Sequence, residues 1–137
     1  MERNVTESTR TQGRASAVYP KQQSVEECIR LCLDCAKVCE QCAAECIRME
    51  TEGMTSCIEA CQDCADICLL SARYLARNSF FHPRACALCA DACEVCVTEC
   101  EKVASSERSE IVELLNQCME ACRRTGESCR KMGMLPS

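Results

Sequence analysis

The chain has 137 residues and a formal net charge of −5 at pH 7, which fits one modest domain. Eighteen residues are Cys and one is His, while Leu, Ile, Val and Phe together number 24, which excludes an ordinary apolar core. The acidic charge, without a clustered basic patch, excludes nucleic acid and anionic membrane surfaces as partners. No signal-like or membrane-spanning apolar run occurs, which predicts a cytoplasmic protein whose thiols stay reduced and serve metal binding.

Residues 1–23 are polar and show neither helical nor strand periodicity, so we expect a flexible N-terminal tail. Ser24 and Glu27 have the spacing of a capping box, which predicts that a helix begins at Ser24. This helix should end near Glu50. Gly53 then suits the left-handed backbone position that follows a helix.

Three further periodic stretches follow, over about residues 54–78, 83–104 and 105–132. Pro83 suits the first turn of the third helix, and the Ser105-Ser106 pair would cap the fourth. Four helices of about 25 residues with short connections predict an all-α fold, an antiparallel up-down four-helix bundle over residues 24–132, followed by a C-terminal tail, 133–137. Gly126 lies inside the last helix, where it costs about 1 kcal/mol relative to Ala.

The cysteines of each predicted helix are separated mainly by alternating steps of three and four residues. Such steps keep side chains on one helical face, so every thiol can point toward the bundle axis. Continuing the steps places Ser71 and Leu75 after the last thiol of the second helix. The predicted Cys-lined core comprises Cys28, Cys32, Cys35, Cys39, Cys42, Cys46, Cys57, Cys61, Cys64, Cys68, Cys86, Cys89, Cys93, Cys96, Cys100, Cys118, Cys122 and Cys129.

A core of thiols is a poor source of stability, because each Cys replaces a larger apolar side chain. Metal binding is the better explanation, and a ligating thiol is a thiolate whose buried charge needs a cation. Cu(I) at about one ion per sulfur balances that charge, and it prefers soft thiolate ligands. Zinc takes four ligands, so the 18 thiolates would hold about four ions and keep about ten charges uncompensated.

Three alternatives to copper remain open at this point. A zinc or general soft-metal buffer would use part of the core. An iron–sulfur electron-transfer protein is a second alternative, although the usual grouped Cys run is absent. A bundle linked by structural disulfides is a third, although such scaffolds are typically short, secreted and loop-rich.

The run Cys86-Ala-Leu-Cys89-Ala-Asp-Ala-Cys93-Glu-Val-Cys96 within a four-helix pattern resembles the copper storage proteins, of the cytosolic kind without an export signal. The resemblance spans about residues 24–132. It implies a bundle filled with many Cu(I) ions, with the eighteen Cys as ligands, and a homo-tetramer. It also implies His near the end of the third helix and the start of the fourth, where this chain has Val103 and Leu114; Leu115 and Thr125 stand where further Cys would be usual.

We therefore predict a cytosolic copper store that is not an enzyme, since no acid/base pair or nucleophile is evident, and that receives Cu(I) from a chaperone or a small thiol. Copper could reach the core at the end that carries Met49 and Met54, or at the other end, which carries His82. Self-association is predicted from an apolar patch of Leu69, Leu70, Tyr74, Leu75, Phe80 and Phe81.

Overall fold

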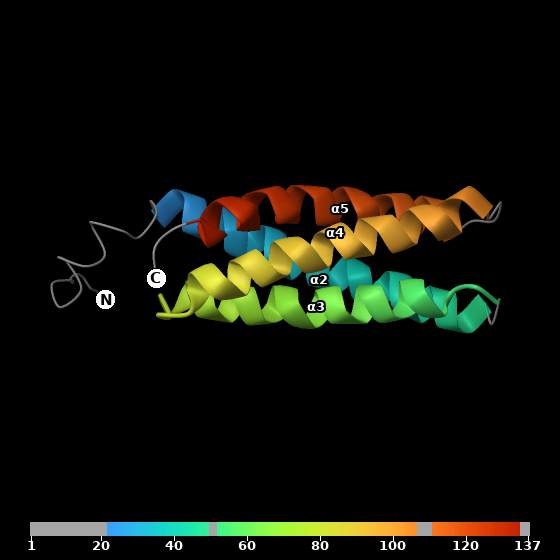
Figure 1. Ribbon diagram of the computed structural model, residues 1–137, viewed down its shortest axis with the longest axis horizontal. Coiled ribbons are helices and arrows are strands. Elements are labelled where there is room, and N and C mark those ends of the chain that lie inside the picture. Colours follow the sequence, from blue (N-terminus) through green and yellow to red (C-terminus); the bar gives the residue numbers. More distant parts are fainter. Residues whose placement is uncertain (1–21, 50–51, 107–110, 135–137) are drawn as a thin grey trace, which may run out of the picture.

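The computed structural model describes residues 22–49, 52–106 and 111–134. Within these ranges the chain forms four helices and no strand: α2 (Gln22–Met49), α3 (Thr55–Ala76), α4 (His82–Ser106) and α5 (Ile111–Gly133). The four helices run along one long axis (Figure 1). The predicted all-α class is confirmed.

Each helix packs against two neighbours, and these pairs close a four-sided bundle. The neighbouring pairs are α2 with α3, α3 with α4, α4 with α5, and α5 with α2, whereas the backbones of helices on opposite corners lie farther apart. Because the connections within the described chain are short, successive helices are antiparallel. The predicted up-down bundle is therefore confirmed, and the faces that meet on its axis come from all four helices.

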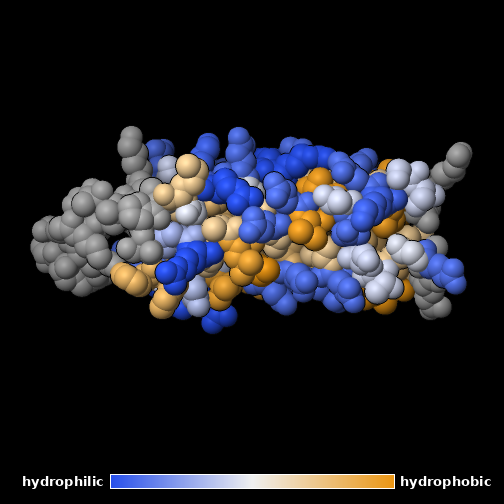
Figure 2. Space-filling model, viewed as in Figure 1, coloured by the Kyte–Doolittle hydropathy of each residue, from blue (hydrophilic) through white to orange (hydrophobic). Residues whose placement is uncertain are grey.

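The face of the molecule seen in Figure 2 is mostly hydrophilic, with apolar patches over α4 between the hydrophilic residues of the flanking helices. Leu88 and Val95 on α4 are about half exposed. In the apolar patch predicted near the α3–α4 connection, Leu69, Phe80 and Phe81 are also exposed. The search for a membrane-spanning segment finds no helix of sufficient length and apolarity among the described residues.

Leu75 does not belong to that patch, because its side chain is only 1% exposed. Its place in the patch was therefore predicted wrongly, whereas its place on the inward face of α3, after Cys68, was right. The remaining members, Leu70 and Tyr74, are half-buried.

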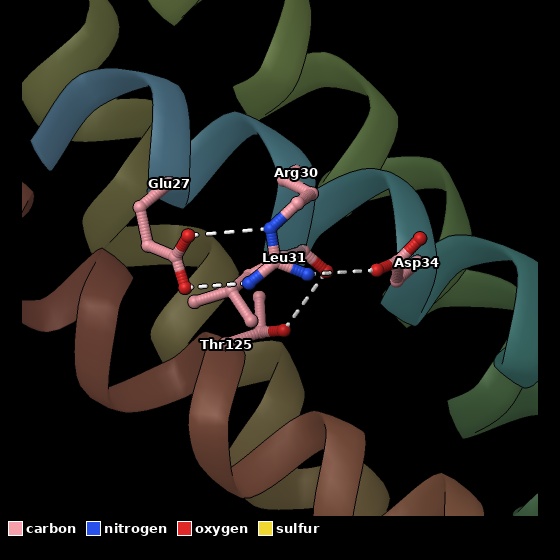
Figure 3. A network of polar contacts seen from close by, with 5 residues as sticks. All are labelled: Glu27, Arg30, Leu31, Asp34 and Thr125. Carbon is pink, nitrogen blue, oxygen red and sulfur yellow. Dashed lines mark hydrogen bonds and ion pairs between the residues drawn. The ribbon is translucent and has the colours of Figure 1, made fainter. Parts of the chain in front are cut away.

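The start of α2 differs from the prediction, because the helix begins at Gln22 and contains Ser24. The predicted capping box is wrong: the Glu27 carboxylate accepts hydrogen bonds from Arg30, at 2.6 and 3.2 Å, instead of reaching back toward Ser24. Arg30 also donates to Asp34 at 3.3 Å (Figure 3). These pairs at spacings of three and four support the first turns of α2. Residues 22 and 23, predicted as part of the tail, belong to this helix, and residues 1–21 lie outside the described chain.

The turns on either side of α3 follow the predicted backbone chemistry. Gly53 has a positive φ of 88°, as predicted, and Glu50 lies outside the described residues. α3 ends at Ala76, slightly before the predicted end, and Asn78 then takes a positive φ of 50°, which Asn tolerates better than most residues. α4 begins at His82, so Pro83 lies in its first turn as predicted.

The prediction that Ser105 and Ser106 cap the fourth helix is wrong, because both residues form the last turn of α4. The Ser106 hydroxyl donates to the Val103 carbonyl at 3.1 Å, so it satisfies a carbonyl in the last turn of its own helix. Described structure resumes with α5 at Ile111, and this helix includes Gly133, which we had assigned to the C-terminal tail; residues 107–110 and 135–137 lie outside the described chain.

Two hydroxyl residues occupy inward positions where the thiol series is interrupted. The Thr125 hydroxyl on α5 donates to the Leu31 carbonyl of α2 at 3.1 Å (Figure 3). The Ser71 hydroxyl on α3 donates to the Ala85 carbonyl of α4, also at 3.1 Å. Both residues are buried, and each bond joins two neighbouring helices.

Candidate metal centre

All eighteen cysteines are buried, each with at most 1% of its surface exposed, and together they fill the bundle axis. We call this set the thiol column. The prediction that every thiol faces the interior is confirmed, and it follows from the alternating steps, which keep one face of each helix toward the axis.

Sulfur atoms from different helices lie within van der Waals contact along the column. The Sγ atoms of Cys32 and Cys129 are 3.5 Å apart, and those of Cys61 and Cys96 are 3.7 Å apart. A disulfide bond is about 2 Å long, so these separations are those of neighbouring thiols. The column is thus a series of soft ligands without covalent bonds between their sulfur atoms.

Three groups of four thiols have sulfur atoms that all lie within 4.8 Å of one another. Two of these groups take one cysteine from each helix, so they form complete cross-sections of the bundle. Cys118 and Cys122 each belong to two of these groups. This sharing favours clusters in which one thiolate bridges two ions over separate ions that each have four ligands of their own. The groups are Cys35, Cys64, Cys93 and Cys122; Cys39, Cys96, Cys118 and Cys122; and Cys42, Cys61, Cys100 and Cys118.

The column continues beyond these groups toward both ends. Two three-thiol groups lie farther out: Cys28, Cys32 and Cys129 toward one end, and Cys42, Cys46 and Cys57 toward the other. Cys68 lies 3.7 Å from Cys89 through their Sγ atoms. Cys86 is fully buried as well.

Hydrogen bonds between thiols separate their pKa values in both directions. Cys100 above all lowers the pKa of Cys61 to about 6, and Cys122 above all lowers the pKa of Cys64 to about 7. The pKa of Cys122 is raised, chiefly through its hydrogen bond with Cys118. A few thiols can therefore ionise near neutral pH while their neighbours keep the protons that stabilise them.

Aliphatic, thioether and imidazole side chains close both ends of the column among the described residues. Met54, Val103 and Leu115 are buried near one end, and His82 and Met132 near the other. Met49 is only half-buried. The side chains of Met54 and His82 thus lie at opposite ends of the column, as predicted.

The family model for copper storage proteins (Csp) matches residues 21–134, which is most of the chain. The chain belongs to the copper storage protein family. The resemblance inferred from the cysteine pattern is therefore confirmed. No curated protein matches the sequence significantly.

Solved structures of copper storage proteins share this fold. Apo copper storage protein 3 from Bacillus subtilis is 38% identical, with a TM-score of 0.69 over 79% of this chain and 97% of that chain. The Cu(I)-bound form of that protein is 37% identical over 81% and 99% of the two chains, with a TM-score of 0.69. A cytosolic copper storage protein from Streptomyces lividans, loaded with five coppers, is 30% identical over 81% and 92%, with a TM-score of 0.70.

The sequence did not reveal the role of Gly126, which it showed only as a costly residue within a helix. In the structure, a Cβ at this position would lie 3.3 Å from the Cys93 Cβ and 3.9 Å from the Ala90 carbonyl oxygen. The backbones of α4 and α5 therefore lie close together here. In this copper storage protein fold, the missing side chain of Gly126 leaves a groove open along the surface between the two helices. The signal that could have indicated it is a glycine inside a predicted helix, where glycine is otherwise costly.

Proposed function

We propose that this protein stores Cu(I) in the cytosol by binding many ions through the thiolates of the thiol column. One observation carries the proposal: all eighteen thiols are buried, and fifteen of them have a sulfur neighbour 3.5 to 3.9 Å away. The family assignment and the Cu(I)-bound relative support it, and the relative from Streptomyces lividans is described as cytosolic. All eighteen cysteines are proposed as ligands.

Charge balance favours copper over zinc for a column of this length. Thiolates that bind metal carry negative charge, and a buried uncompensated charge is costly. Monovalent Cu(I) at about one ion per sulfur neutralises them, whereas tetrahedral zinc at about four sulfurs per ion compensates only half. The four-thiol groups could each hold a zinc ion, but Cys118 and Cys122 would then serve two ions at once.

Storage, rather than catalysis, fits the chemistry of the column. Neutral thiols can be buried without metal, so the bundle can fold before loading, and each incoming Cu(I) then displaces protons. The carboxylates of Glu27 and Asp34 accept hydrogen bonds from Arg30 on the exposed face of α2, and they do not form an acid/base pair in a cleft. The protein therefore acts by holding copper.

A homo-tetramer and delivery of copper by a chaperone or a small thiol complete the proposal. Exposed apolar side chains support self-association: Phe80 and Phe81 form an edge-to-face pair with ring centroids 5.8 Å apart, near exposed Leu69. Because free Cu(I) binds thiols tightly, transfer from another thiol ligand is the natural source.

The decisive experiment titrates Cu(I) into reduced, metal-free protein against a calibrated Cu(I) chelator, with and without Zn(II). Uptake far above the about four ions that tetrahedral zinc sites would allow, and unaffected by Zn(II), is the expected result. Saturation at about four ions with effective competition by Zn(II) would show a soft-metal buffer instead. Size-exclusion chromatography with light scattering tests the tetramer separately.

A further inference from the structure

A groove between α4 and α5 reaches the thiol column from the side. It has a volume of about 470 Å³ and includes Cys93 and Cys122 among its lining residues. Ala90 and Val97 of α4 and Gly126 of α5 form further parts of its wall. Both cysteines belong to one four-thiol group, so the groove leads directly to a cross-section of the column.

Gly126 leaves the groove open where any larger residue would narrow it. A Cβ at this position would come within 3.3 Å of the Cys93 Cβ, so a longer side chain would have to occupy the groove itself. Beyond the groove the helices meet more closely, because a Cβ on Gly133 would lie 2.9 Å from the Ala87 backbone. The groove is therefore closed before Gly133.

Ion pairs hold α4 and α5 together on both sides of Gly126. One turn before it, Arg123 pairs with Glu101 at 3.4 Å. One turn after it, Arg130 pairs with Asp91 at 3.1 Å and with Glu94 at 3.8 Å. These exposed pairs are individually weak, but they cross the groove on either side of the gap and leave its centre unbridged.

The two ends of the column offer a more obstructed path. Leu115, Met54 and Val103 at one end, and Leu75 and Met132 at the other, are each at most 5% exposed. Copper arriving along the axis would have to displace these large side chains. In the groove, Cys93 and Cys122 are themselves part of the lining, although each is at most 1% exposed.

We propose that this groove is a lateral route by which Cu(I), bound to a low-molecular-mass thiol, reaches Cys93 and Cys122. The inference rests on the storage function proposed above. The transfer is a ligand exchange: the bond from Cu(I) to the carrier sulfur breaks as a bond to Cys93 Sγ forms, and the Cys93 proton passes to the departing carrier thiolate. Copper remains monovalent throughout, so no oxidant or reductant is needed.

The size of the groove indicates the class of carrier. Its volume lies in the range of about 300 to 1,000 Å³ that is typical of sites for small molecules, whereas a protein domain cannot enter it. Its rim carries both signs of charge, with Arg123 and Lys131 beside Glu94 and Glu127. Such a rim can accept a small thiol peptide, which carries both carboxylate and ammonium groups.

The test obstructs the groove and measures how fast the reduced full-length protein takes up copper. Gly126→Leu fills the groove from α5, and Thr98→Trp covers it from the exposed rim on α4. Asn116→Trp, on the exposed face of α5 outside the groove, is the matched control. Cu(I) is supplied as its complex with reduced glutathione; stopped-flow absorbance of the Cu(I)–thiolate bonds gives the rate, and chelator competition gives the final copper content.

Both groove variants should load several-fold more slowly than the wild type and Asn116→Trp, and should reach the wild-type copper content. If Gly126→Leu does not fold, Thr98→Trp alone decides the question. Equal rates in wild type and groove variants, or equal slowing of the Asn116→Trp control, would overturn the lateral route and leave storage intact. Failure of the wild type itself to accumulate copper would refute the storage proposal instead.

Discussion

Replacing Leu75 by Ala should lower the thermal unfolding midpoint of the copper-free protein by about 10 °C. Leu75 is among the largest fully buried side chains, in a core made otherwise mostly of Cys and Ala. Removing its branched end leaves a cavity and costs about 3 kcal/mol. An unfolding entropy of about 2 cal/mol/K per residue over 137 residues converts this loss into the stated shift.

Circular dichroism of reduced, metal-free protein measures the midpoint, and Leu69→Ala on the same helix is the matched control. Leu69 is 40% exposed, so its truncation should lower the midpoint by no more than a few degrees. The Cu(I) capacity of Leu75→Ala should equal that of the wild type, because Leu75 provides no soft ligand. Equal midpoints for the two variants would refute the view that large aliphatic side chains at the ends stabilise the empty bundle.

Three further predictions concern the thiols and one hydroxyl. Cys122→Ser should reduce the Cu(I) capacity, measured by chelator competition, more than Cys46→Ser, because Cys122 belongs to two four-thiol groups and oxygen is a poor Cu(I) ligand; equal losses would contradict shared coordination. Thr125→Val should lower the thermal unfolding midpoint of the copper-free protein by about 4 °C, because it loses about 1 kcal/mol of hydrogen bonding to α2. Thr125→Ser should lower this midpoint less. A Val variant as stable as the wild type would show that the hydrogen bond contributes nothing to stability. The thiolate absorbance of the copper-free protein should rise around pH 6 to 7 as Cys61 and Cys64 ionise. Because their pKa values lie below the usual 9.0, the contribution of these two thiols to the free energy of unfolding should grow toward pH 9 and disappear as the pH falls through 6. A titration with its first step near pH 9 would be the contrary result.

The helices and the thiol column could be predicted because both depend on a local rule. Steps of three and four residues place Cys28 and Cys129 on inward faces whatever lies between them in the chain, and the structure buries both completely. Gly53 and Pro83 likewise act within one turn of their own position, so their places in the turns were predictable. The assignment of the eighteen thiols as copper ligands is still a prediction.

The features that could not be predicted depend on which atoms meet across the bundle. Ser106 has the chemistry of an N-cap, yet its hydroxyl donates to a carbonyl of α4, the helix that it ends. In the sequence, Leu75 stands among apolar neighbours that predict a surface patch, and only the packing of the helices shows that its side chain is internal. Gly126 is costly in an isolated helix, and its use becomes visible only beside Cys93 on another helix.

The hydroxyls of Thr125 and Ser71 form hydrogen bonds between helices that do not depend on whether copper is bound. Each donates to a carbonyl of a neighbouring helix, and neither has a proton that Cu(I) displaces or a sulfur that it seeks. The register of α5 on α2 and of α4 on α3 is thus secured by bonds that stay the same as the thiols around them exchange protons for metal. A bundle joined in this way is expected to keep the spacing of these helix pairs while copper is bound, so later ions would meet the same arrangement of helices as the first.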